Sequence, residues 1–245
     1  MSDELAIKER LLQFWESRDK KQLLPALSAE AQELVYTNPF AFLLAGCLDR
    51  GMIADIVWTF PFYLKQDLGH LDPYRIAMMS IDEIRAALER IPKKPRYMRD
   101  APRTVQELVA MVSGRLSGDA AKLWQDRTAR AVQDDLMKIY GVGRGIAAMI
   151  VILLYRLGWV EFPDLHTIPV KPDVHVQRVM YRAGLADQMS EDAATCAARR
   201  LNPQFPGDID SPLWVIGREH CFANPAAIQC ARCPIDDLCP KVGLQ

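Results

Sequence analysis

The chain has 245 residues, half of them hydrophobic and a quarter charged, which is typical of a soluble globular protein with one large or two small domains. A formal net charge of −1 does not indicate a general nucleic-acid binder, although it still allows a basic patch on one face. Segment 1–15 lacks the apolar core of a signal peptide, and the longest apolar run, 146–155, is too short to span a bilayer. We therefore expect a cytoplasmic protein with no membrane partner and no disulfides.

Apolar residues at helical spacing, separated by prolines and capping residues, predict a chain built from helices. Pro61 falls inside one such pattern and predicts a kink or a restart there. Ser80 with Glu83 three residues later predicts a capping box. The predicted helical segments are 4–15, 29–36, 39–48, 54–68, a short one beginning at 72–73, 81–91, 104–116, 119–130, the two arms of 136–155, 173–183, 191–201 and 210–221. Neither a β-hairpin signal nor an internal repeat accompanies them, so the predicted fold class is all-α.

The stretch 136–155, LMKIYGVGRGIAAMIVILLY, predicts two helices joined by the tight turn Gly141-Val142-Gly143. Glycines permit positive φ and let another backbone approach closely. The first N–H groups of the second helix would point outward, where they suit a phosphate. Two interpretations follow from this pattern, a helix-hairpin-helix that grips a nucleic-acid backbone or an ordinary αα-hairpin.

Two further segments lack helical periodicity. The most basic run, KKPRYMR at 93–99, predicts a solvated surface loop, with phosphate contact as the alternative. Segment 158–172 contains three prolines and is too long for a simple turn, so it predicts a loop or a domain junction.

Four of the six cysteines lie close together near the C-terminus with the spacing C-x8-C-x2-C-x5-C. They are Cys221, Cys230, Cys233 and Cys239. In a reducing compartment this density indicates a metal or cluster site rather than unrelated buried thiols. The spacing alone does not separate zinc from a [4Fe–4S] cluster, and Pro234 and Pro240 directly after two ligands are compatible with a cluster loop. Cys47 and Cys196 fall within helical patterns and are expected in the core.

Asp173 stands between Pro172 and a predicted helix, where the ordinary role of an aspartate is that of an N-cap. The order of glycine hairpin, aspartate and cysteines resembles that of the helix-hairpin-helix DNA glycosylases of the endonuclease III and adenine-glycosylase type. In that family the hairpin reads L-P-G-V-G-x-x-T-A, against IYGVGRGIA at 139–147 here. The family's V-D-T-H-x-x-R is matched by PDVHVQR at 172–178, and its C-x6-C-x2-C-x5-C loop is matched except for two extra residues after Cys221. The resemblance covers essentially the whole chain.

The resemblance implies a two-lobed, all-α endonuclease III-like fold. A six-helix domain with the helix-hairpin-helix would span 29–158. A second helical domain would combine 1–28 with 159–245 and carry a [4Fe–4S] cluster on loop 221–239, with zinc as the alternative. The active site would lie in a cleft, with the hairpin on one wall and Asp173 at its base.

The activity implied is that of a base-excision-repair DNA glycosylase, a monomer acting on double-stranded DNA with a damaged or mismatched base. Asp173 would stabilise positive charge on the sugar of the flipped nucleotide and activate a water molecule. The bifunctional branch of the family has a lysine where this chain has Gly145, so we expect a monofunctional enzyme. The alternatives are a glycosylase/lyase with a displaced lysine, Lys138 or Lys171, and a non-catalytic DNA-binding protein on the same scaffold. In a prokaryote the protein would associate with the nucleoid.

The remaining expected site residues are DNA contacts and a base pocket. The predicted DNA contacts are Gly141, Val142, Gly143, Arg144 and Gly145 of the hairpin, together with Arg50. Arg50 lies in PFAFLLAGCLDRGMIA at 39–54, which looks like the family's first core helix and the loop that fills the gap left by a flipped base. The predicted pocket residues are Tyr140, His166 and His175. Segment 159–172 is longer than in the family, and we expect it mainly to cover the domain junction.

Overall fold

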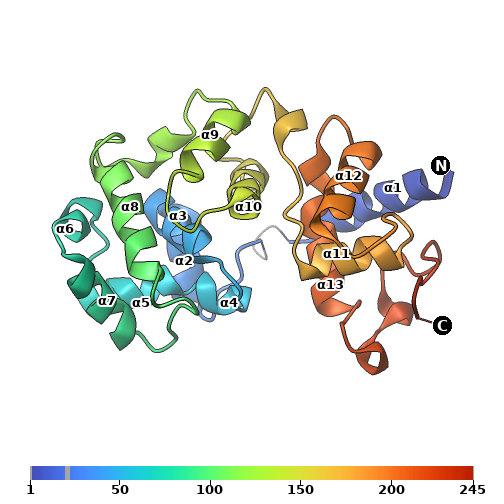
Figure 1. Ribbon diagram of the computed structural model, residues 1–245, viewed down its shortest axis with the longest axis horizontal. Coiled ribbons are helices and arrows are strands. Elements are labelled where there is room, and N and C mark those ends of the chain that lie inside the picture. The colour runs from blue at the N-terminus through green and yellow to red at the C-terminus, as the bar shows by residue number, and fades with distance from the viewer. Residues whose placement is uncertain (1, 20–22, 245) are drawn as a thin grey trace. The chain divides into compact units, whose positions relative to one another are not determined.

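The computed structural model describes residues 2–19 and 23–244, and every regular element within these ranges is a helix (Figure 1). This confirms the predicted all-α fold class. No helix in the described part of the chain is long and apolar enough to cross a membrane. The chain divides into two compact units, which we call unit 1 (2–19 and 162–244) and unit 2 (23–161). Residues 1, 20–22 and 245, which the predicted domain ranges also include, lie outside the described residues.

Unit 2 is built around one buried helix. Its elements are α2 (Ala29–Thr37), α3 (Pro39–Leu48), α4 (Ala54–Val57), α5 (Phe60–Leu68), α6 (Pro73–Ala77), α7 (Ile81–Arg90), α8 (Ala101–Ser113), the 3-10 turn η2 (Ala120–Leu123), α9 (Ala129–Leu136) and α10 (Arg144–Arg156). Every residue of α3 after Pro39 is buried, and α3 contacts α2, α5, α8 and α10. Burying one large apolar side chain contributes about 1.5–3 kcal/mol, so α3 supplies much of the apolar core of this unit.

Capping residues set most of the helix boundaries in unit 2. Asn38 ends α2 and caps α3, where its side chain accepts a hydrogen bond of 2.9 Å from the N–H of Ala41. Ser80 and Glu83 form the predicted capping box at the start of α7. Pro61 lies in the first turn of α5, so the predicted segment 54–68 restarts there as a separate helix.

The predicted helix 119–130 is wrong. Asp119 caps only the short 3-10 turn η2, and Thr128 then caps α9 by accepting from the N–H of Ala131. Between these caps Asp126 has a φ of +54°, which an α-helix does not allow. Two competing caps close together therefore break the segment.

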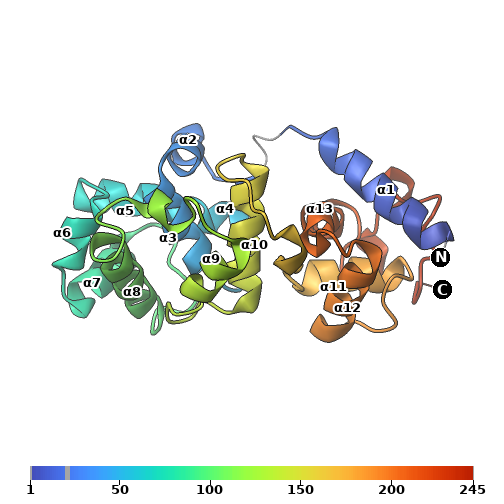
Figure 2. The same cartoon turned by 90° about the horizontal axis from the view of Figure 1, so that it is seen from above.

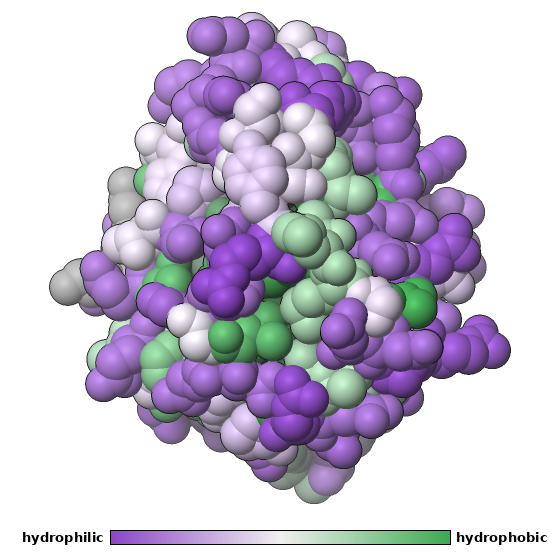
Figure 3. All heavy atoms as spheres, turned by 90° about the vertical axis from the view of Figure 1, so that its left-hand side faces the viewer, coloured by the Kyte–Doolittle hydropathy of each residue, from purple (hydrophilic) through white to green (hydrophobic). Residues whose placement is uncertain are grey.

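The surface of unit 2 is mostly hydrophilic on the side that carries α6, with a group of apolar residues near the middle of the view (Figure 3). Tyr74 and Met78, at α6 and its C-cap, are exposed. The ring of Tyr74 lies over Gly118, where a Cβ would come within 2.4 Å of it.

Unit 1 combines the N-terminal helix with the C-terminal third of the chain. Its elements are α1 (Ser2–Glu16), η3 (Leu165–Thr167), α11 (Val174–Arg182), α12 (Glu191–Leu201), η4 (Pro206–Ile209), α13 (Asp210–Glu219), η5 (Pro225–Ala227) and η6 (Cys230–Arg232). Helix α11 packs against α12 and α13, and α1 lies alongside α12 and α13 (Figure 2). Buried Leu11, Val176, Val179 and Ile216 belong to the shared core.

The two cysteines outside the C-terminal group have different environments. Cys47 is buried in α3, as predicted, and burial raises the pKa of its thiol to about 12. Cys196 is exposed, so its predicted core position is wrong. The buried face of α12 is formed by Ala194, Ala197 and Ala198, and residue 196 falls off this face at 100° per residue.

Candidate functional site

The glycine turn joins α9 to α10 and leaves the start of α10 without a side-chain cap. Gly141 has a φ of +83°, the left-handed conformation that favours glycine. Gly143, the N-cap of α10, has the extended values φ −92° and ψ 178°, so only one of the two turn glycines requires positive φ. Gly143 is exposed, and open space lies where its Cβ would be. The first N–H groups of α10 thus face an open surface, beside exposed Arg144 and half-buried Gly145.

Helix α8 holds the hairpin from one side. The hydroxyl of Thr104 donates to the carbonyl of Tyr140 at 2.8 Å, and the N–H of Tyr140 donates to Oε2 of Glu107 at 2.6 Å. The guanidinium of Arg103 lies 4.1 Å from the centre of the Tyr140 ring, and the Tyr140 hydroxyl donates to Asp100 at 3.4 Å. Tyr140 therefore packs on α8, and buried Val142 fixes the turn from within.

Arg50 lies directly against the hairpin. A Cβ on Gly141 would come within 2.6 Å of Nη1 of Arg50, and the positive φ of Gly141 is the feature that favours glycine at this position. The guanidinium of Arg50 also lies 4.8 Å from the centre of the Tyr97 ring and 3.7 Å from Oδ2 of Asp100. On the same ring Arg96 makes a second cation–π contact at 5.7 Å, and its Nη1 donates to the carbonyl of Gly51. The basic run 93–99 is a loop, as predicted, and these contacts place it beside Arg50.

Asp173 is the N-cap of α11. Its Oδ1 accepts hydrogen bonds from the N–H groups of His175 at 2.8 Å and Val176 at 3.0 Å. Both bonds fall on one oxygen of a half-buried carboxylate, and the positive end of the helix dipole attracts its charge. The segment before it is also fixed, because the N–H of Lys171 donates to Oδ1 of Asp210 at 2.5 Å and Gln177 donates to the carbonyl of Pro172. Asp173 is thus held in one orientation.

The two histidines predicted for the base pocket lie in unit 1 in different surroundings. His166 is exposed on η3. His175 packs between α11 and α13, since a Cβ on Gly217 would lie 2.7 Å from the His175 Cβ, and its ring meets Trp214 edge-on. Tyr140, the third predicted pocket residue, belongs to unit 2.

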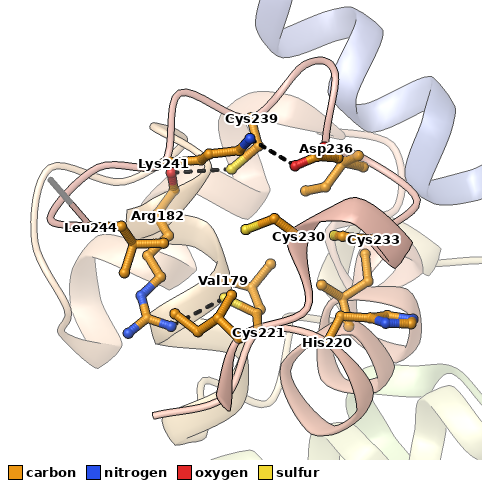
Figure 4. Close-up of a pocket in the computed structure, with 13 residues that line it drawn as sticks. Val179, Arg182, His220, Cys221, Cys230, Cys233, Asp236, Cys239, Lys241 and Leu244 are labelled. Atoms are coloured by element: carbon orange, nitrogen blue, oxygen red, sulfur yellow. Dashed lines mark hydrogen bonds and ion pairs between the residues drawn. The ribbon is translucent and has the colours of Figure 1, made fainter. Parts of the chain in front are cut away.

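The four C-terminal cysteines line one pocket of unit 1, and Figure 4 shows their side chains gathered around a single cavity. All four are half-buried. Burial, together with the charges of neighbouring cysteines, raises the pKa of the Cys233 thiol to about 11 and also raises that of Cys239. Without an electrophilic partner these two thiols are therefore neutral at pH 7. The same walls include His220, whose Nδ1 is buried and has no hydrogen-bond partner among the described residues.

Two arginines connect the cysteine pocket to α11. Arg178 is buried and donates to the carbonyls of Cys221 at 2.7 Å and Gly217 at 2.8 Å. Arg182 donates to the carbonyl of Phe222 at 2.6 Å, and Cys239 Sγ donates to the Arg182 carbonyl at 3.4 Å. The roles of Arg182, Asp210 and Glu107 are not visible in the sequence, because their partners lie about 30–40 residues away and no motif marks them.

Solved structures that share this architecture include two endonuclease III–DNA complexes and a thymine-DNA glycosylase. A trapped covalent intermediate of endonuclease III with DNA, in an estranged-adenine complex, has a TM-score of 0.64 and 22% identity over 96% of this chain and 92% of that chain. A non-covalent endonuclease III–DNA complex has a TM-score of 0.61 and 25% identity over 85% and 86%. A thermostable thymine-DNA glycosylase has a TM-score of 0.61 and 15% identity over 98% and 96%. No protein-family model matches the sequence, and neither does any curated protein. The chain has the endonuclease III-like fold that the motifs predict.

Proposed function

We propose that this protein is a base-excision-repair DNA glycosylase that hydrolyses the N-glycosidic bond of a base flipped out of double-stranded DNA. The observation that carries the proposal is Asp173, a rigidly held carboxylate that heads α11 in an endonuclease III-like fold. Structures of the same architecture include two endonuclease III–DNA complexes and a thymine-DNA glycosylase.

In the proposed reaction the carboxylate of Asp173 acts on the sugar of the flipped nucleotide. Positive charge builds on the sugar as the base leaves, and a fixed negative group near C1′ stabilises it. The same carboxylate can accept a proton from the attacking water. Because Oδ1 is occupied by the N–H groups of His175 and Val176, we assign proton transfer to Oδ2.

We propose that the hairpin and Arg50 bind the DNA. The uncapped N–H groups of Gly143, Arg144 and Gly145 suit a backbone phosphate, and the Arg144 side chain adds a positive charge. Tyr140 and His166 remain proposed pocket residues. For His175 the packing against Trp214 and Gly217 favours a role in fixing the start of α11 behind Asp173.

Arg50→Ala is expected to weaken excision from duplex DNA by about ten- to a hundredfold and to affect a single-stranded substrate less, because we assign Arg50 to the gap that the flipped base leaves. The measurement is the single-turnover excision rate on both substrates. Arg90→Ala is the matched control, because Arg90 is also an arginine of unit 2 that forms an ion pair, in this case with Asp67. Equal losses on both substrates would remove the gap-filling role.

We propose a monofunctional reaction that leaves an intact abasic site. Gly145 cannot act as a nucleophile, and the amine of Lys138 is engaged in an ion pair of 2.7 Å with Asp135. The second candidate lysine, Lys171, lies two residues before Asp173. If Lys171 acted as the nucleophile, the enzyme would be a glycosylase/lyase. Borohydride would then trap a covalent enzyme–DNA adduct.

We propose that Cys221, Cys230, Cys233 and Cys239 hold a [4Fe–4S] cluster. The residues present fit such a group, because four thiols line one cavity. The wall of this cavity also contains the buried Nδ1 of His220, which has no hydrogen-bond partner among the described residues. Among the described residues, no three metal-binding side chains are arranged as a site for a metal ion, so the assignment rests on the four cysteines and the pocket they share. A cluster distributes its four ligands over several iron atoms. When bound, it would tie the C-terminal loop to α11 through Arg178 and Arg182.

A panel of duplexes with different damaged or mismatched bases, treated with and without alkali after incubation, tests the function. Strand cleavage only after alkali is expected for a monofunctional glycosylase. Cleavage without alkali would indicate a lyase. Binding with no cleavage on any lesion would indicate a non-catalytic DNA-binding protein on the same scaffold.

A further inference from the structure

One buried carboxylate of unit 2 is surrounded by three cations. Asp135, in the last turn of α9, has a side chain only 4% exposed. Arg127 Nη1 lies 2.6 Å from its Oδ2, Arg115 Nη1 lies 2.8 Å from the same oxygen, and Lys138 Nζ lies 2.7 Å from Oδ1. We call these four residues the Asp135 cluster. Burial alone would raise the pKa of Asp135, but the hydrogen bonds from Lys138, Arg127 and Arg115 outweigh it and lower the pKa to about 2.

The cluster carries surplus positive charge at the surface. Its three cations and one carboxylate leave a net charge of +2 at neutral pH. Arg127 is the most enclosed of the cations and also donates to the carbonyl of Leu123. The side chains of Arg115 and Lys138 are 48% and 72% exposed. Holding the loop before α9 therefore needs Arg127, whereas the other two cations present their charge to solvent.

The position of the cluster links it to the hairpin. Lys138 precedes Gly143 by five residues, so their Cα atoms are separated by at most about 18 Å. One DNA strand carries a phosphate about every 3.4 Å along the helix axis. A length of about 18 Å therefore corresponds to about five phosphates of one strand. A DNA strand whose phosphate is bound at the hairpin can reach the Asp135 cluster with a phosphate only a few nucleotides further along.

We propose that Arg115 and Lys138 form a second contact surface for the DNA phosphate backbone, next to the hairpin. Asp135 orients the two cations from beneath, and its single negative charge is outweighed by the three cations around it. This inference rests on the proposed function, and it adds a sequence-independent contribution to binding while leaving the chemistry at Asp173 untouched.

The test is the salt dependence of duplex binding by full-length Arg115→Gln, Lys138→Gln and the double variant. The slope of log K against log[KCl] is negative, and each lost phosphate contact should reduce its magnitude by about 0.9, or by about 1.8 in the double variant. The affinity should fall by the same factor on lesion-containing and lesion-free duplex.

Two control proteins separate DNA contact from folding. Arg130→Gln removes a cation of α9 that is ion-paired with Asp134 and lies outside the Asp135 cluster, so the wild-type slope should persist. The double variant Arg115→Lys with Lys138→Arg keeps both charges and should also keep the slope. The inference is overturned if the charge-keeping double variant shows the same reduced salt dependence as the charge-removing one. It is also overturned if the Arg115→Gln/Lys138→Gln protein binds duplex with the wild-type salt dependence. A wild-type protein that neither binds nor cuts any duplex would instead overturn the proposed function itself.

Discussion

Asp173→Asn is expected to lower the single-turnover rate of base excision by about 10³-fold or more and to leave duplex affinity nearly unchanged. The amide keeps the shape of the carboxylate but carries no negative charge to stabilise the sugar and no base for the attacking water. Asparagine is as good an N-cap as aspartate, so α11 should keep its start and its stability. Rapid-quench excision assays and equilibrium binding on the same lesion duplex measure the two effects.

Asp72→Asn is the matched control for this substitution. Asp72 caps α6 in the same way, with Oδ1 accepting from the N–H groups of Tyr74 and Arg75. Both variants exchange a capping carboxylate for an amide, but only one of them removes the proposed catalytic group. Near wild-type excision by Asp173→Asn would refute its catalytic role. Equal losses in both variants would show that the cap, and not the chemistry, is responsible.

Cys233→Ala is expected to abolish iron binding and to lower the free energy of unfolding by about 4 kcal/mol or more, because loss of a bound metal group is among the most destabilising single changes. The wild-type protein should be brown and contain iron and acid-labile sulfide in about equal amounts. Cys196→Ala is the control, since Cys196 is exposed and lies outside the pocket. Absorbance, metal analysis and urea unfolding of the three proteins measure the outcome.

A colourless wild-type protein that contains one zinc ion would contradict the iron–sulfur assignment while leaving four cysteine ligands in place. A protein that contains neither metal, with Cys233→Ala and Cys196→Ala equally stable, would remove the metal site altogether.

The start of a helix could be predicted from the sequence wherever a nearby capping residue determines it. Ser80 and Asp173 each cap the helix that follows them, as predicted, because a cap acts over three or four residues and is visible in the sequence. The prediction of one helix over 119–130 was wrong because this segment contains two capping residues, Asp119 and Thr128. The structure shows that each of them starts a separate element.

Site features that depend on distant residues could not be predicted in this way. The support of Asp173 comes from Asp210, which accepts from Lys171 across 39 residues, and the hairpin is held by Thr104 and Glu107 of α8. Arg178 was visible as part of a motif, but its hydrogen bonds to the chain near Cys221 follow only from the packing of α11 on α13. Such contacts are set by tertiary packing, which leaves no short-range signature.

The discontinuous composition of unit 1 has a consequence for biogenesis. Segment 2–19 is synthesised before the rest of unit 1, and the helices it packs against, α12 and α13, begin only at Glu191. Unit 2 is continuous from 23 to 161 and can fold while the rest is still being made. The apolar face of α1 therefore has no partner within unit 1 until α12 and α13 have been synthesised. The cysteine pocket includes Cys239, so it can be assembled only after the whole of unit 2 has been synthesised.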